Sequence, residues 1–374
     1  MLQRHRLVRQ RALLGEPHAR HAVLRRLGEQ PGTGLLGESL PRAAHDHPVG
    51  VLLTHCRSLA YLRGPGDCTS ARMIRMRNIV VLDAPSNLGL RPPAPGTVPG
   101  CHKLAGALRE QRIVHRLHAL EGGVVVPPRY DRGDWQEGDG VFNAAAIASY
   151  TVKLADRIER HVRAGDFPVV LGGDCSIQLG ASLALRRVGR YGLAAIDASP
   201  DFRHPGNSDR IGAAGGEEVA LATGRGQRDL TDLEGRGPYL RDEDVRFFGV
   251  RDAFEEDRAE LAALKIPVVT VGDLREWGAD AVARATAQAF EIPEIDGFWV
   301  HLDADCLDPS VMPAVDSPDP DGLQPAELLA LLRPLVTSPA CVGLNVTIYD
   351  PDLDPEGTAG ALLTDIVVDA FAQS

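Results

Sequence analysis

The sequence predicts a three-layer α/β/α fold, in which a mostly parallel sheet of about eight strands lies between two layers of helices. The main observation is an alternation along the chain, where short apolar runs of strand length are separated by longer stretches with helical spacing of apolar residues. A second observation is that these runs are largely apolar throughout, which is typical of parallel strands buried on both faces. Because 44% of the 374 residues are hydrophobic, the chain can bury the core that this fold needs.

Each strand is expected where an apolar run gives way to turn-forming or charged residues. The first run, within residues 77–83, is Ile-Val-Val-Leu, and it ends at Asp83 before a loop rich in proline and glycine. The other strands are expected at 123–126, 168–171, 192–196, 245–250, 267–271, 297–302 and 341–346. Helices are expected between them at 143–163, 176–187, 254–264, 279–290, 325–335 and 358–372.

Residues 1–75 differ in character from the rest of the chain. They are rich in Arg and His, contain no Lys and have no sustained helical or strand period. We expect this N-terminal extension to be disordered, or to be an over-extension of a reading frame that begins at Met73 or Met76. An Arg-rich start also occurs in organellar targeting segments, but those have an amphipathic period that is missing here. Residues 76–374 are expected to form the α/β domain.

Charge, hydropathy and cysteine content argue against several classes of protein. A net charge of −11 is unfavourable for binding nucleic acid, because phosphate recognition requires clustered Lys and Arg. No run reaches the roughly 18–20 apolar residues that cross a bilayer, so no membrane partner is expected. The six cysteines form no CxxC pairs, and we expect reduced thiols in a cytoplasmic protein.

Acidic residues follow three of the expected strands, where open parallel sheets place their ligand crevice, and the first is Asp174 after the strand at 168–171. Asp197 and Asp201 follow the second strand, while Asp303 and Asp305 follow the third and lie two residues apart, so a strand would turn both of their side chains to one face. Two carboxylates about 4 Å apart repel by roughly 4 kcal/mol at an effective dielectric of about 20. If the four converge, either a divalent cation holds them or one or more takes up a proton.

Three motifs resemble those of the arginase/agmatinase/formiminoglutamase superfamily, the ureohydrolases. They are Gly-Gly-Asp-Cys-Ser at 172–176, Asp-Ala-Ser-Pro-Asp at 197–201 and Asp-Ala-Asp-Cys-Leu-Asp-Pro at 303–309, in the order and separation of the family. The likeness runs from about Met76 to the C-terminus. It implies an arginase-like domain with a two-Mn²⁺ centre at the strand ends, which activates water for attack on a guanidinium carbon.

The resemblance also implies a role for each acidic residue. Asp197 and Asp303 would bridge both metal ions, Asp201 would complete the first position, and Asp305 would belong to the second. The candidate metal ligands are thus Asp197, Asp201, Asp303, Asp305 and Cys175, and the candidate catalytic residues are Asp201 and Cys175.

The chain departs from the family pattern at four places. Cys175 and Ser199 stand where the family has its two His ligands. The loop at 212–216 lacks the His that helps proton transfer in arginases, and residues 345–348 contain no carboxylate that could hold a guanidinium. A site made of oxygen ligands still suits Mn²⁺ or Mg²⁺.

Cys175 has three interpretations. It could be a metal ligand that favours a softer ion, a nucleophile whose thiolate is stabilised by the start of a helix, or a buried thiol that fills the space of an imidazole. Cys306 is expected in the core. His204 is expected to face solvent, and His301 to lie in the core or beside a ligand, since its side chain shares the face of Asp303.

The function expected from these residues is metal-dependent hydrolysis of a C–N bond in a small guanidino or amidino compound, at an altered Mn²⁺ centre. Two alternatives stay open. One is a catalytically inactive homologue that serves as a binding or assembly module, and the other is metal-independent thiol chemistry at Cys175. The resemblance also implies a homo-oligomer, since relatives commonly form trimers or hexamers.

Overall fold

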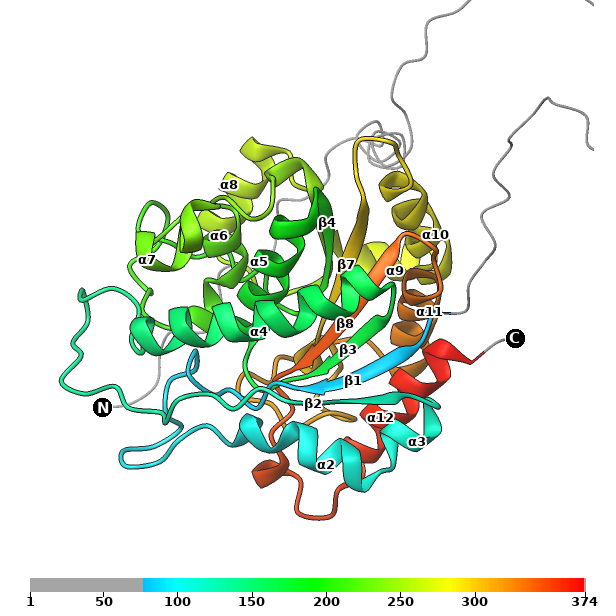
Figure 1. Cartoon of the computed structure of the whole chain (residues 1–374), viewed down its shortest axis with the longest axis horizontal. Helices are drawn as coiled ribbons and strands as arrows, with labels where there is room; N and C mark the ends of the chain where they lie inside the picture. The colour runs from blue at the N-terminus through cyan, green and yellow to red at the C-terminus, as the bar shows by residue number, and fades with distance from the viewer. Residues whose placement is uncertain (1–76, 373–374) are drawn as a thin grey trace, which may run out of the picture. The chain divides into compact units, whose positions relative to one another are not determined.

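The computed structural model describes residues 77–372, apart from the side chain of Glu256, so the expectations for residues 1–75 lie outside the described residues. Eight parallel strands form one sheet in the order β2-β1-β3-β8-β7-β4-β5-β6 (Figure 1). The strands are β1 (Ile79–Asp83), β2 (Leu120–Val124), β3 (Phe167–Leu171), β4 (Tyr191–Ile196), β5 (Val245–Val250), β6 (Val268–Thr270), β7 (Gly297–Asp303) and β8 (Cys341–Thr347).

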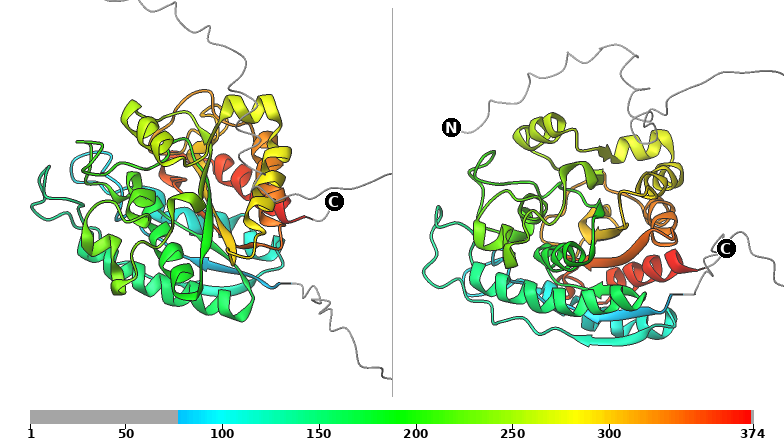
Figure 2. Two further views of the ribbon diagram at one scale, coloured as in Figure 1. Left: turned by 90° about the horizontal axis from the view of Figure 1, so that it is seen from above. Right: turned by 45° about the horizontal axis from the view of Figure 1, so that its top comes forward.

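Helices cover both faces of the sheet, and each layer packs on its own apolar core (Figures 1 and 2). One layer consists of α2 (Leu104–Glu110), α3 (Ile113–Arg116), α9 (Val271–Trp277), α10 (Ala279–Phe290), α11 (Pro325–Val336) and α12 (Thr358–Phe371). The other consists of α4 (Ala144–Ala164), α5 (Gln178–Val188), α6 (Glu218–Ala222), α7 (Arg228–Thr231) and α8 (Glu255–Leu264). The three-layer α/β/α prediction is confirmed.

The central strand β7 shows how the sheet divides its side chains between the two layers. Phe298, Val300 and Leu302 belong to the core under α9–α12, whereas Trp299 belongs to the core under α4–α8. Because side chains alternate along a strand, His301 and Asp303 share the face of Trp299. The acidic end of β7 therefore opens toward the α4–α8 layer.

Two strands differ from their expected positions. The strand expected at 123–126 lies at Leu120–Val124, where Leu120 pairs with Val80 of β1. β6 is shorter than expected because the Thr270 side chain accepts a hydrogen bond from the amide of Asp273 and caps α9. Within the described part of the chain, no helix combines the length and apolarity required to cross a membrane.

Candidate metal centre

The loop after β3 depends on two glycines that allow close packing. A Cβ atom on Gly173 would overlap the carbonyl oxygen of Ser86, and one on Gly172 would overlap the side chain of Ile177. Neither glycine adopts the left-handed φ that would explain it as a turn residue. These glycines are therefore required by the approach of neighbouring segments at the carboxyl edge of the sheet.

Asp174 fixes the point at which the next helical turn begins. Its carboxylate accepts a hydrogen bond from the amide of Ser176 at 2.9 Å and one from the hydroxyl of Ser86 at 2.8 Å. Asp174 thus caps the 3-10 turn Cys175–Ile177, which leads into α5. This arrangement places the thiol of Cys175 over the ends of the central strands.

Asp197 after β4 and Asp303 at the end of β7 are held in the same way. Oδ1 of Asp197 accepts a hydrogen bond from the amide of Ser199 at 2.7 Å, and Oδ1 of Asp303 accepts one from the amide of Asp305 at 2.8 Å. In each case the residue two positions later anchors one oxygen and leaves Oδ2 directed into the cluster. The spacing of both motifs is explained by this local bond as well as by the strand period.

A first group of potential ligand atoms comes from Cys175, Asp197, His301 and Asp303, which lie within 4.8 Å of one another. The Cys175 thiol donates to Oδ2 of Asp303 at 2.7 Å, and Nε2 of His301 lies 3.7 Å from Oδ2 of Asp197. All four side chains are buried. The structure therefore brings three of the candidate ligands together and adds His301.

A second group consists of carboxylate oxygens of Asp197, Asp201 and Glu218, also within 4.8 Å of one another. Asp201 has a φ of 43°, a left-handed conformation that is uncommon for a non-glycine residue, and its amide bonds to the hydroxyl of Ser199. Asp197 belongs to both groups. Sequence reasoning missed Glu218, for which the only local signal is an acidic pair before the apolar run 219–222.

The other residues considered from the sequence lie outside these two groups. Oδ1 of Asp305 accepts a hydrogen bond from the amide of Ala198 at 3.2 Å, which links the loops after β4 and β7. Nε2 of His204 is bound to Glu260 at 2.8 Å. Cys306 is fully buried in the core under α9–α12.

Burial and mutual repulsion dominate the electrostatics of the cluster. Burial first, and neighbouring carboxylates second, raise the pKa values of four acids far above their usual range: Asp197, Asp201, Asp303 and Glu218. Burial also raises the pKa of Asp305 to about 6. Burial and the nearby Asp303 raise the pKa of the Cys175 thiol. Without a cation, these groups favour their neutral forms.

A chain of hydrogen bonds fixes the protonation of His301. Nε1 of Trp299 donates to Oδ1 of Asn345 at 2.6 Å, and Nδ2 of Asn345 lies 2.7 Å from Nδ1 of His301. Because an indole N–H can only donate, the amide must turn its NH₂ to the imidazole, and Nδ1 must accept. Burial lowers the pKa of His301 to about 4, so the ring is neutral and carries its proton on Nε2. His301 therefore offers the cluster an N–H donor and no free lone pair.

The donor set fits a divalent cation. Both oxygens of Glu218 are buried and have no hydrogen-bond partner in any other described residue. The carboxylates crowd together in the same small volume, where their charges are stable only if a proton or a cation neutralises them. Carboxylate oxygens are the ligands that Mn²⁺ and Mg²⁺ favour.

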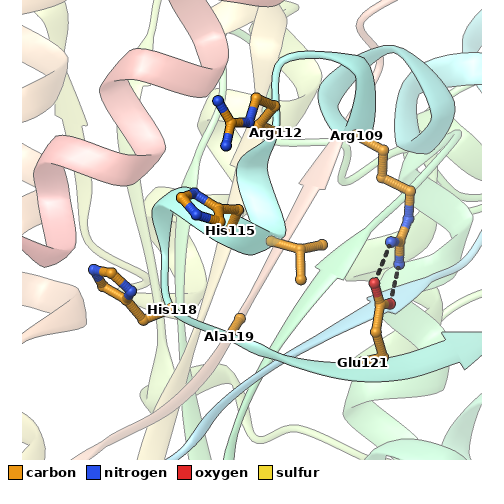
Figure 3. A pocket seen from close by; sticks show the side chains of 7 residues that line it. Arg109, Arg112, His115, His118, Ala119 and Glu121 are labelled. Atoms are coloured by element: carbon orange, nitrogen blue, oxygen red, sulfur yellow. Dashed lines mark hydrogen bonds and ion pairs between the residues drawn. The ribbon is translucent and has the colours of Figure 1, made fainter.

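A separate surface pocket lies at α2, α3 and the start of β2, and it shares no residue with the carboxylate groups (Figure 3). Arg109, Arg112, His115 and His118 give it a basic lining. The Arg109 guanidinium is already paired with Glu121 at 3.0 Å and with Asp83 at 2.8 Å. Its charge is therefore balanced within the protein.

Comparison with known proteins agrees with this architecture. The model of the arginase family matches residues 77–372. The arginase of Bacillus caldovelox is 26% identical over 300 residues, covering 80% of this chain and 99% of that protein. Its solved structure has a TM-score of 0.73 with the same coverage of both chains. The arginase of Staphylococcus aureus strain COL is 25% identical over 314 residues, covering 81% of this chain and 99% of that protein.

The fold is also shared with a more distant enzyme, the formimidoylglutamase of Bacillus subtilis. That structure has a TM-score of 0.61 at 18% identity, with 79% of this chain and 86% of that chain covered. The resemblance inferred from the three motifs is thus confirmed over the whole described region. The chain belongs to the arginase family, within the ureohydrolase superfamily.

Proposed function

We propose that this protein is a metal-dependent hydrolase that cleaves a C–N bond in a small guanidino or amidino compound, at a metal centre altered from the family pattern. Family membership supports a hydrolase of the ureohydrolase type. The observation that carries the proposal is the convergence of buried carboxylates from β4, β7 and α6, with Asp197 common to both groups. Such a cluster is costly to bury unless it binds cations.

Different residues of the cluster would bind the metal ions and donate hydrogen bonds. Bound divalent cations would balance the carboxylates and lower the pKa of water to near neutrality, which supplies the nucleophile. Asp197 and Asp303 are pre-oriented by backbone amides, so little reorganisation is needed when they bind. The Nε2–H of His301 would donate a hydrogen bond beside Asp197, to the carboxylate or to a bound substrate.

The substrate differs from arginine in this proposal. Two polar residues near the end of β8 are already committed to internal contacts. Asn345 bonds to Trp299 and His301, and Thr347 accepts a hydrogen bond from Cys175 at 3.3 Å. Neither side chain can replace the carboxylate that would hold a guanidinium. A positively charged amidine or guanidine nevertheless suits an acidic site of this kind.

Metal-independent thiol chemistry at Cys175 receives no support from the geometry. The thiol donates a hydrogen bond to Asp303, and both burial and neighbouring carboxylates oppose its ionisation. A nucleophilic cysteine requires a lowered thiol pKa, whereas burial and the carboxylates raise the pKa of Cys175 although a helical turn begins at this residue. In the proposed centre Cys175 acts as a hydrogen-bond donor or as a metal ligand.

Three further features complete the proposal. Carboxylate donors support Mn²⁺ as the resident ion, unpaired buried cysteines at 101, 175, 306 and 341 agree with a reducing, cytoplasmic location, and family membership supports a homo-oligomer, a trimer or a hexamer. Elemental analysis and light scattering of the purified protein test the first and the last of these.

The experiment is to load the full chain with Mn²⁺ and assay a panel of guanidino and amidino compounds for urea, ammonia or formamide. Asp303→Asn should lower kcat by at least about 100-fold, since a ligand is lost. Asp352→Asn, a change at a half-exposed surface acid, should leave the rate unchanged. Full metal occupancy without product from any compound would refute the proposal, and well-folded protein that takes up no metal would favour the non-catalytic homologue.

A further inference from the structure

We propose that Glu218 is a metal ligand, and that Asp197, Asp201 and Glu218 form an all-oxygen position for a hard divalent cation, Mn²⁺ or Mg²⁺. The inference rests on the proposed function for the existence of a metal centre, and it identifies a ligand that none of the three motifs contains. It also makes the two positions of the centre chemically unequal, since the other group contains the sulfur of Cys175.

The placement of Glu218 is the first step. It is the first residue of α6, a short helix that packs on α5 in the α4–α8 layer. Its side chain is 0% exposed, and one of its carboxylate oxygens lies within 4.8 Å of oxygens of Asp197 and Asp201. Glu218 therefore reaches the cluster from α6, whereas Asp197 and Asp201 belong to the loop after β4.

The lack of any partner is the second step. Neither carboxylate oxygen of Glu218 accepts a hydrogen bond from another described residue, and no described Lys, Arg or His forms an ion pair with it. A buried polar group without a partner costs roughly 2–7 kcal/mol, and an ionised one costs more. A structural role does not explain why the fold would keep this carboxylate.

The neighbouring Glu217 shows what a structural glutamate looks like in the same segment. It is 2% exposed, and its Oε1 accepts a hydrogen bond from the amide of Gly212 at 2.5 Å. Burial raises the pKa of Glu217 to about 7, and the Gly212 amide and the Arg203 guanidinium limit that rise. The segment thus provides one buried glutamate with a backbone donor from a neighbouring residue, whereas the next one faces the carboxylates of Asp197 and Asp201.

The chemistry of the donors sets the class of cation. Three carboxylates and no nitrogen or sulfur are the donors that Mn²⁺ and Mg²⁺ prefer, whereas thiolate selects softer ions such as Zn²⁺. Glu218 therefore supplies a ligand to a centre whose family imidazoles are replaced by Cys175 and Ser199. His301 does not fill that role, because its Nε2 carries a proton.

The test compares Glu218→Gln, which keeps the shape and removes the charge, with Glu217→Gln as the matched control. Metal-free full-length protein is titrated with Mn²⁺ by calorimetry, without substrate. The wild type and Glu217→Gln should bind two equivalents per chain. Glu218→Gln should bind one, or bind the second at least about tenfold more weakly. Unchanged stoichiometry and affinity in Glu218→Gln would overturn the inference, as would a wild type that binds no Mn²⁺.

Thermal unfolding gives a second readout that a purely structural role would not produce. In EDTA, Glu218→Gln should melt at a higher temperature than the wild type, because a carboxylate is removed from a crowded, buried cluster. In saturating Mn²⁺ the order should reverse. If Glu218→Gln is the less stable protein under both conditions, the carboxylate is structural and the inference fails.

A conservative variant separates misfolding from lost ligation. Glu218→Asp keeps the charge but withdraws the oxygens, so it should regain part of the second Mn²⁺ equivalent that Glu218→Gln loses. The result is independent of the hydrolase assay. Two bound ions, one of them dependent on Glu218, together with no hydrolysis, would uphold the ligand and refute the activity. Hydrolysis with unchanged binding in Glu218→Gln would do the reverse.

Discussion

At the residue scale, the surroundings of Cys175 determine the pKa and the reactivity of its thiol. The side chain is 1% exposed, and burial with the nearby Asp303 keeps its pKa above that of a free thiol. We expect iodoacetamide at neutral pH to leave Cys175 unmodified in the folded protein, and to modify it once the protein is unfolded in urea. Mass spectrometry of tryptic peptides provides the measurement. Rapid native alkylation of Cys175 with loss of activity would restore the thiol mechanism.

Asn345 connects two buried groups that have no other described partner. Asn345→Leu leaves the Trp299 N–H and Nδ1 of His301 unpaired, and each unpaired group costs about 1–3 kcal/mol. We therefore expect the free energy of unfolding to fall by at least about 2 kcal/mol in urea titrations. Asn78→Ala, at an exposed asparagine, serves as the control and should change it by less than about 0.5 kcal/mol.

Asp197 and Asp303 could be predicted from the sequence, because they directly follow apolar runs that had to be strands. Glu218 could not be predicted, since it follows a glycine-rich loop and reaches the cluster only through the packing of α6 on α5. The position of the proton on Nε2 of His301 could not be predicted from the sequence either. It depends on a cross-strand neighbour, Asn345, that lies 44 residues away.

At the scale of elements, the loop after β3 leaves little space for side chains. Gly173→Ala would push a Cβ into the Ser86 carbonyl, so we expect a loss of stability of at least about 2 kcal/mol. Gly106→Ala is the matched control, because Gly106 lies in α2 with open space around its Cα. That change should stabilise the protein by about 0.5–1 kcal/mol. Equal effects of the two substitutions in thermal unfolding would contradict the packing argument.

Most elements could be predicted because their apolar runs are long and clearly bounded. The helices at 143–163, 279–290 and 325–335 are found within one or two residues of their expected limits. Short helices could not be predicted in the same way. These are α2, α3, α6, α7 and α9, which span between four and seven residues each. In such short pieces tertiary contacts and caps, such as Thr270 before α9, outweigh the periodic signal.

At the scale of the whole molecule, the buried acids make stability depend on pH. The folded pKa of Asp305 is about 6, against an ordinary value of 3.8, so the folded protein keeps a proton that the unfolded chain releases. Stability of the metal-free protein should therefore fall as the pH rises from about 4 to about 6. Burial also raises the pKa values of Asp197 and Asp303, so these acids contribute to the fall in the same direction.

Divalent cations should reverse this trend, because they bind the deprotonated carboxylates and compete with protons. Melting temperatures measured across the same pH range in EDTA and in Mn²⁺ provide the comparison. The two curves should diverge as the pH rises. A melting temperature in EDTA that increases steadily from about pH 4 to about pH 6 would show that the carboxylates are not buried together.

The architecture as a whole could be predicted from the alternation of runs and helices, whereas the strand order could not. In the sheet, β8 lies between β3 and β7, so the C-terminal strand joins two halves of the chain. That insertion brings Thr347 beside both Cys175 and Asp303. Such neighbours follow from the topology of the complete sheet and have no local signal.

Because Asp197 lies in both groups of potential ligand atoms, two ions bound there would not bind as independent events. The ion that arrives first would remove the proton from this carboxylate, which would alter the free energy available to the second ion. By linkage, the second ion alters the affinity of the first by the same factor. The titration of this protein with Mn²⁺ should therefore be cooperative. Substitution of a ligand in one group should also change the metal affinity of the other group.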